Sequence, residues 1–136
     1  MTPYRDFAEL VLNNVKDRDY RFVVADRGAD ITITAVHGGG IEPLTSELAA
    51  SIAGEEYNLY DFRGIRAQGN DMLRIPIGRF DEMRLRGLMM RSQVGLSIQG
   101  VEGETPIAHL GGRNRKLKRI LALCLGEMGF RIGDPV

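Results

Sequence analysis

The chain has 136 residues, the length of one ordinary domain and too few for two. Hydrophobic residues make up 43% and charged residues 26%, which is typical of globular domains and excludes disordered and membrane-spanning classes. Eighteen basic residues balance eighteen acidic ones, so no overall field draws the protein to nucleic acid or to an anionic membrane. We therefore expect a single domain over residues 1–136, with one site on one core.

Periodicity in the apolar residues separates the predicted helices from the predicted strands. Thr45 is the expected N-cap of the second helix and Gly54 its stop. In chain order the pattern predicts a helix over 4–15, strands over 22–25 and 31–36, a helix over 45–53, strands over 57–62 and 72–75, a helix over 81–91, strands over 94–99 and 107–110, a helix ending near 128 and a strand beginning at 130–132.

Strands that alternate with helices predict an α/β fold, a three-layer α/β/α sandwich with a mixed central sheet. The ligand crevice of such a fold lies beyond the carboxyl ends of the strands, and both His37 and Gln99 fall at such ends. The last helix carries an apolar stripe that includes Leu117, Leu121 and Cys124, so we expect that thiol to be buried and inert. With one cysteine there is no internal disulfide, and without a leader or spanning segment the predicted location is the cytoplasm.

The most informative segment is His37-Gly38-Gly39-Gly40-Ile41-Glu42. Three consecutive glycines are typical of a sharp turn or of a close approach to a ligand. If the loop folds back, the imidazole and the carboxylate five residues on converge, and such a pair suits zinc. The alternative is a solvent-exposed turn whose histidine bonds a carbonyl group. Because the loop lacks the lysine and hydroxyl residue of a nucleotide-binding loop, hydrolysis of ATP or GTP has no support.

The loop and the residues after it, Pro43 and then Thr45-Ser46-Glu47-Leu48-Ala49, resemble the signature of the poly-γ-glutamate hydrolase family of bacilli and their phages. Further matches fall in the family's order along most of the chain. They are Arg27-Gly28, Gly69-Asn70, Leu73-Arg74-Ile75, Phe80-Asp81-Glu82, Leu96-Ser97-Ile98, Gly111-Gly112 and Gly129-Phe130. The resemblance implies a compact fold like that of zinc carboxypeptidases.

The resemblance also implies a zinc ion held by the loop histidine, the following glutamate and a later histidine. The first two correspond to His37 and Glu42, whereas the third position is Gln99, whose amide oxygen is a poor zinc ligand. His109, in a predicted strand, is a less favoured candidate for the third ligand. The family's catalytic glutamate is expected in a strand beyond Phe130 and has no evident match, so the carboxyl-terminal part of the family fold is expected to be missing.

Polar residues after the third strand are the candidates for binding an anionic substrate beside the loop. They are Arg63, Arg66, Asn70 and Arg74. A basic run over residues 113–119 is expected to be a solvated helix face, and the alternative is a site for a phosphate or polycarboxylate at the start of that helix. No nucleic-acid motif is present.

Two hypotheses follow. The first is a zinc-dependent γ-glutamyl amide hydrolase, with full or impaired activity, in which zinc activates water. The second is a catalytically degenerate protein, of bacterial or phage origin, that binds or sequesters a small anionic ligand or a host component. We also expect self-association as a homo-oligomer through the segment 130–136, which light scattering would detect.

Overall fold

The computed structural model describes residues 2–133. The chain divides into two compact units, Met1–Gly100 and Val101–Val136. His37 and Glu42 lie in the first unit, and His109 lies in the second.

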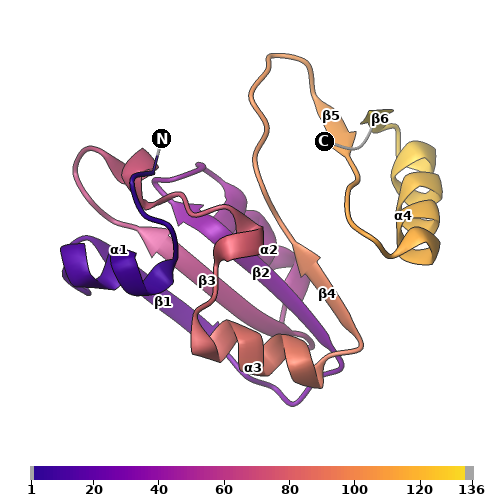
Figure 1. Cartoon of the computed structure of the whole chain (residues 1–136). Helices are drawn as coiled ribbons and strands as arrows, with labels where there is room; N and C mark the ends of the chain where they lie inside the picture. The colour runs from indigo at the N-terminus through magenta and orange to yellow at the C-terminus, as the bar shows by residue number, and fades with distance from the viewer. Residues whose placement is uncertain (1, 134–136) are drawn as a thin grey trace. The chain divides into compact units, whose positions relative to one another are not determined.

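A mixed four-stranded sheet forms the centre of the first unit (Figure 1), as the sequence predicts. Its order is β1 (Tyr20–Ala25), β3 (Asn58–Gly64), β2 (Ile31–Gly39) and β4 (Val94–Ser97). Strand β2 runs parallel to both β3 and β4, whereas β1 is antiparallel to β3. Since β2 is a central strand and is buried along nearly its whole length, the loop that follows it starts from the interior of the unit.

Helices cover both faces of this sheet, so the predicted three-layer arrangement is confirmed for the first unit. Residues of α1 (Phe7–Asn13) and α3 (Met83–Arg91) pack with Tyr60 and Phe62 on one face. On the other face α2 (Thr45–Ala53) packs its alanines against alternate residues of β2 and β3.

Between β3 and α3 the prediction of a strand over 72–75 is wrong. This segment contains two short 3-10 helices, η1 (Asn70–Leu73) and η2 (Ile77–Arg79). The amide groups of Arg74 and Ile75 bond to nearby carbonyls in the same segment, not to a neighbouring strand. Leu73 and Ile75 are apolar because they are buried in the core, which produced the misleading pattern.

The predicted N-cap of α2 is also wrong. The N-cap is Leu44, which adopts a left-handed backbone conformation, and no side chain caps this helix. The Thr45 hydroxyl instead donates to the carbonyls of His37 and Glu42, at 3.1 and 2.8 Å. Thr45 therefore closes the preceding loop.

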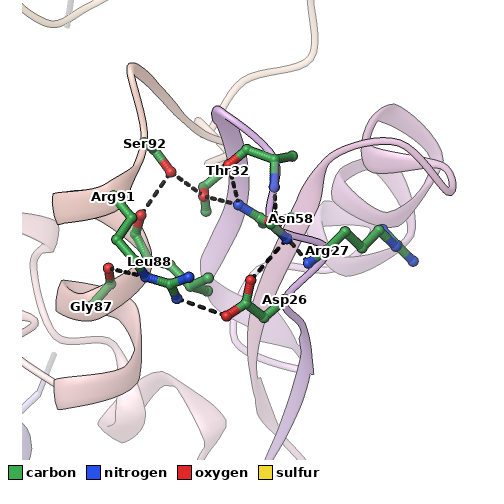
Figure 2. Close-up of polar contacts among 10 residues, drawn as sticks. Asp26, Arg27, Thr32, Asn58, Gly87, Leu88, Arg91 and Ser92 are labelled. Carbon is green, nitrogen blue, oxygen red and sulfur yellow. Dashed lines mark hydrogen bonds and ion pairs between the residues drawn. The ribbon is translucent and has the colours of Figure 1, made fainter.

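Opposite the carboxyl ends of the parallel strands, a polar network joins the starts of β2 and β3 to the end of α3 (Figure 2). Asn58 is its centre, because its amide accepts from the backbone of Arg27 and Ala29 and donates to the Thr32 hydroxyl. Thr32 in turn contacts Ser92 at 2.7 Å. Every one of these groups is matched to another protein group, which indicates a structural brace.

The second unit contains β5 (Ile107–His109), α4 (Arg115–Glu127) and β6 (Arg131–Gly133), with β5 and β6 parallel. The prediction that the apolar stripe of α4 is buried is wrong, because no residue of α4 is buried and Cys124 is exposed. Two strands of three residues each are too small to cover a helix of 13 residues.

The described residues test only part of two further expectations, the predicted location and the predicted self-association. Within residues 2–133 no helix is long and apolar enough to cross a membrane. Self-association through the segment 130–136 stays a prediction, since residues 134–136 lie outside the described part of the chain.

The contact between β3 and the start of α3 gives a test of the core. Tyr60 is fully buried, and its hydroxyl donates to Oε1 of Glu82 at 2.6 Å; burial and that carboxylate raise the pKa of Tyr60. We expect Tyr60→Phe to lower the free energy of unfolding by about 1–3 kcal/mol, because Glu82 loses its buried donor. Urea denaturation measures this change. Tyr57→Phe, at a half-buried tyrosine, is the control and should change it by less than about 0.5 kcal/mol; equal losses would contradict the assignment.

Candidate functional site

The loop folds back on itself through backbone hydrogen bonds. The carbonyl of His37 accepts from the amide of Glu42 at 2.9 Å, and the amide of Gly40 donates to the carbonyl of Gly64 at 2.9 Å. Strand β2 runs on to Gly39, beyond the predicted end at residue 36, so His37 lies within it. The register between β2 and β3 shifts between Ala35 and Gly38, so the strand bulges at His37 before Gly38 and Gly39 pair with β3 again. These bonds bring the side chains of His37 and Glu42 together, as the sequence predicts.

His37 and Glu42 form a buried pair. Nδ1 of His37 lies 3.1 Å from Oε2 of Glu42, and the two residues are 4% and 7% exposed. The alternative of a solvent-exposed turn is therefore wrong about exposure, whereas the bond from the histidine to a carbonyl that it expected is present. Oε1 of Glu42 accepts from the amide of Gly100 at 2.7 Å, which links the loop to the segment that follows β4.

The other ring nitrogen fixes the orientation of the imidazole. Nε2 of His37 lies 2.6 Å from the carbonyl oxygen of Ile75, and since a carbonyl only accepts, Nε2 carries the hydrogen. Histidines that bind a metal through one ring nitrogen usually donate the N–H of the other to a carbonyl or a carboxylate.

The three glycines are needed for contacts within the protein. A Cβ atom at Gly38 would clash with Oδ1 of Asp61 and with Oγ of Ser46. Gly39 has a φ of +61° and lies against the backbone of Gly64, and a Cβ at Gly40 would lie 2.5 Å from the Asn70 amide. The loop is thus packed tightly on β3 and on the segment after it.

Asp61 and Ser46 belong to this site, and the sequence analysis missed both. The Ser46 hydroxyl accepts from the amide of Gly39 at 2.8 Å and donates to Asp61 at 2.8 Å. Burial raises the pKa of the Asp61 carboxyl, and Ser46 and Arg63 partly offset this. The available signal was an acidic residue between the two aromatic residues Tyr60 and Phe62.

The four residues predicted to bind substrate lie in different surroundings. Arg74 contacts Glu42 at 3.3 Å, and Arg63 lies between Asp61 and Glu47, at 3.6 and 3.5 Å. Arg66 approaches Asp19 at 3.9 Å. The Asn70 amide is bonded on both sides to the backbone of Arg66, so it braces the loop. Of the four, the structure therefore brings Arg63 and Arg74 to the charged groups of the His37 loop and its neighbours.

Residue 99, where the resemblance implies the third zinc ligand, does not supply one. Gln99 is exposed, and its amide nitrogen donates to Ser97 at 3.4 Å. His109 pairs with Gly133 within the second unit. Within residues 2–133 no group of three or more His, Cys, Asp or Glu side chains is placed to hold a metal ion. A catalytic zinc commonly takes three protein ligands, so the residues present do not fit such a centre.

The packing of the loop can be tested at Gly38. We expect Gly38→Ala to lower the free energy of unfolding by about 1–3 kcal/mol, because the added methyl group overpacks the contact with Asp61 and Ser46. Gly87→Ala, in α3 with open space around it, is the control and should be neutral or stabilising by up to about 1 kcal/mol. Chemical denaturation of both variants measures the difference. A neutral Gly38→Ala would show that the loop is loosely packed.

Several known proteins are similar to this chain in sequence and in fold. The chain is 35% identical over 127 residues to the UPF0714 protein YndL of Bacillus subtilis. The matched stretch covers 93% of this chain and 50% of YndL. It thus spans about half the length of that relative. A solved structure described as zinc-free apo YndL superposes with a TM-score of 0.93 at 32% identity, covering 100% of this chain and 66% of the other.

A bacteriophage poly-γ-glutamate hydrolase superposes with a TM-score of 0.94, covering 100% of this chain and 67% of the phage protein. At 22% identity this likeness shows the fold alone. The sequence profile of the poly-gamma-glutamate hydrolase family matches residues 4–135. Because that match covers nearly the whole chain, this protein belongs to the poly-γ-glutamate hydrolase family.

Proposed function

We propose that this chain is a binding protein for γ-glutamyl chains, or for a similar small polycarboxylate, and that it does not hydrolyse them with a zinc centre of its own. The observation that carries the proposal is the contact of Arg74 with Glu42 at 3.3 Å, at a site where residues 2–133 supply no third metal ligand. The site is closed by internal contacts, yet the Arg74 side chain remains 44% exposed.

Arginine is suited to this ligand because its planar guanidinium can bind a carboxylate through two parallel hydrogen bonds. Arg74 uses one terminal nitrogen on Glu42, and Arg63 is held by Asp61 and Glu47 while its side chain is 36% exposed. Because both arginines are held in place, they lose less side-chain entropy when a ligand binds. A chain with repeated carboxylates can engage both at once.

A second candidate function is zinc-dependent amide hydrolysis, the first of the two sequence hypotheses. The observation in its favour is the orientation of His37, whose Nε2 is bonded to the Ile75 carbonyl while Nδ1 faces Glu42. The description of the solved YndL structure as zinc-free gives this candidate additional support. Gln99, at the position where the resemblance implies a third ligand, makes it the weaker of the two.

A binding assay with a fluorescent γ-linked glutamate oligomer tests the proposal. We expect saturable binding in the presence of a chelator, with no shortening of the oligomer when zinc is added. Arg74→Gln and Arg63→Gln should each weaken binding by about tenfold or more, since each removes a charge-assisted contact. Arg86→Gln, at an exposed arginine of α3, is the matched control and should bind like the native protein.

Two results would contradict the proposal. Absence of saturable binding, or binding that is unaffected by both arginine substitutions, would show that this is not a carboxylate site. Zinc-dependent shortening of the oligomer that is lost in His37→Ala would establish the second candidate.

A further inference from the structure

Asp61 is a buried carboxylate beside one of the two arginines assigned to the ligand. It is 3% exposed and lies in β3, two residues before Arg63. Within residues 2–133 a single hydrogen bond reaches its side chain, the bond from the Ser46 hydroxyl to Oδ1 at 2.8 Å. Oδ2 faces Nε of Arg63 at 3.6 Å, and no described group accepts the hydrogen of that nitrogen. The charge of Asp61 is therefore balanced mainly by one arginine.

Asp19 shows how a buried aspartate is stabilised elsewhere in the first unit. It is 7% exposed, yet it accepts from Arg18 at 2.8 and 3.3 Å and from the Val15 amide at 2.7 Å. These bonds, from Arg18 and then from Val15, hold the pKa of Asp19 below its usual range. Asp61 has the opposite shift, because burial raises the pKa of its carboxyl. A buried carboxyl group with a single donor is easier to protonate.

We propose that Asp61 couples the binding of an anion at Arg63 to the uptake of one proton, so that the site binds carboxylates more tightly in mildly acidic solution. The inference rests on the proposed function, in which Arg63 contacts the ligand. A ligand carboxylate shares the guanidinium with Asp61 and adds a negative charge beside it. Oδ2 then takes a proton from the solvent, since Oδ1 already accepts from Ser46.

The surroundings of Asp61 contain few other charges. Glu47 of α2 contacts Arg63 at 3.5 Å and adds to the negative charge around Asp61. The cross-strand neighbours of Asp61 in β1 and β2 are Val23 and Ala35, which are uncharged. Burial raises the pKa of the Asp61 carboxyl, and Arg63 is the cation that opposes this shift. A ligand that shares the charge of Arg63 therefore favours the protonated form.

The direction of the pH dependence follows from linkage. Because the bound anion raises the pKa of Asp61, the gain in affinity is complete below the pKa in the free protein and is lost as the pH rises through the pKa in the complex. We expect a γ-linked glutamate oligomer to bind about fivefold or more tightly at about pH 5 than at about pH 8. Since imidazoles titrate in the same range, the share of Asp61 is measured with Asp61→Asn, in which both histidines remain.

Carbon NMR of the aspartate carboxyl groups tests the coupling without a ligand. We expect Asp61 to titrate above Asp19 in the native protein. Arg63→Gln should raise the pKa of Asp61 further because it removes the cation, and Glu47→Gln should lower it because it removes a negative charge. Asp30→Asn, at an exposed aspartate just before β2, is the control and should leave Asp61 unchanged. A pKa of Asp61 that is the same in the native protein and in Arg63→Gln overturns the inference.

Calorimetry with the γ-linked glutamate oligomer, in two buffers of different ionisation enthalpy, measures the proton uptake on binding. We expect the native protein to take up protons and Asp61→Asn to take up fewer. At about pH 8 the affinity of Asp61→Asn should equal or exceed that of the native protein, because a neutral amide resembles the protonated acid. Asp61→Asn retains an oxygen that can accept from Ser46, and circular dichroism checks its folding. Asp30→Asn should take up as many protons as the native protein.

The outcomes separate this inference from the proposed function. Equal proton uptake by the native protein and a folded Asp61→Asn variant overturns the inference and leaves the proposed function standing. A native protein without saturable binding of the oligomer overturns both. If Asp61→Asn does not fold, the comparison of the Asp61 pKa between the native protein and Arg63→Gln decides.

Discussion

The site depends on the burial of one carboxylate. Glu42 is 7% exposed, so its charge has to be balanced within the protein, and several parts of the first unit contribute to that. The Gly100 amide comes from the segment after β4, Nδ1 of His37 from the bulged end of β2, and the Arg74 guanidinium from the connection after η1. Because these segments meet at Glu42, their positions are coupled.

The glycine loop makes this convergence possible. His37 and Glu42 are five residues apart, and the turn that joins them packs on β3 and Asn70 with no room for side chains at Gly38 or Gly40. These contacts stabilise the fold by themselves, because a side chain at either glycine would disrupt the packing of the turn.

Sequence patterns predicted the layers of the first unit well and its connections poorly. Helical periodicity in α3 follows from its one buried face, and the aromatic run in β3 follows from a strand that is buried on both faces. The segment at Leu73 and Ile75 is apolar for a different reason, since two side chains fill the core from an irregular stretch. For α4 the periodicity was correct, but periodicity cannot show whether a partner surface covers the stripe.

Of the candidate site, the sequence predicted only groups that belong to side chains. His37 and Glu42 stand out because an imidazole and a carboxylate flank three glycines. The groups that orient them are the Ile75 carbonyl and the Gly100 amide, and backbone groups have no sequence signature. Thr45 looked like a helix cap because a hydroxyl residue starts the helix, whereas its hydroxyl bonds to the loop carbonyls.

Diffraction from crystals grown with zinc, recorded at the zinc absorption edge, tests the account most directly. We expect no anomalous peak between His37 and Glu42, and the Arg74 guanidinium within hydrogen-bonding reach of the glutamate. A peak about 2.0–2.2 Å from both Nδ1 of His37 and a carboxylate oxygen of Glu42, with Arg74 displaced, would contradict it.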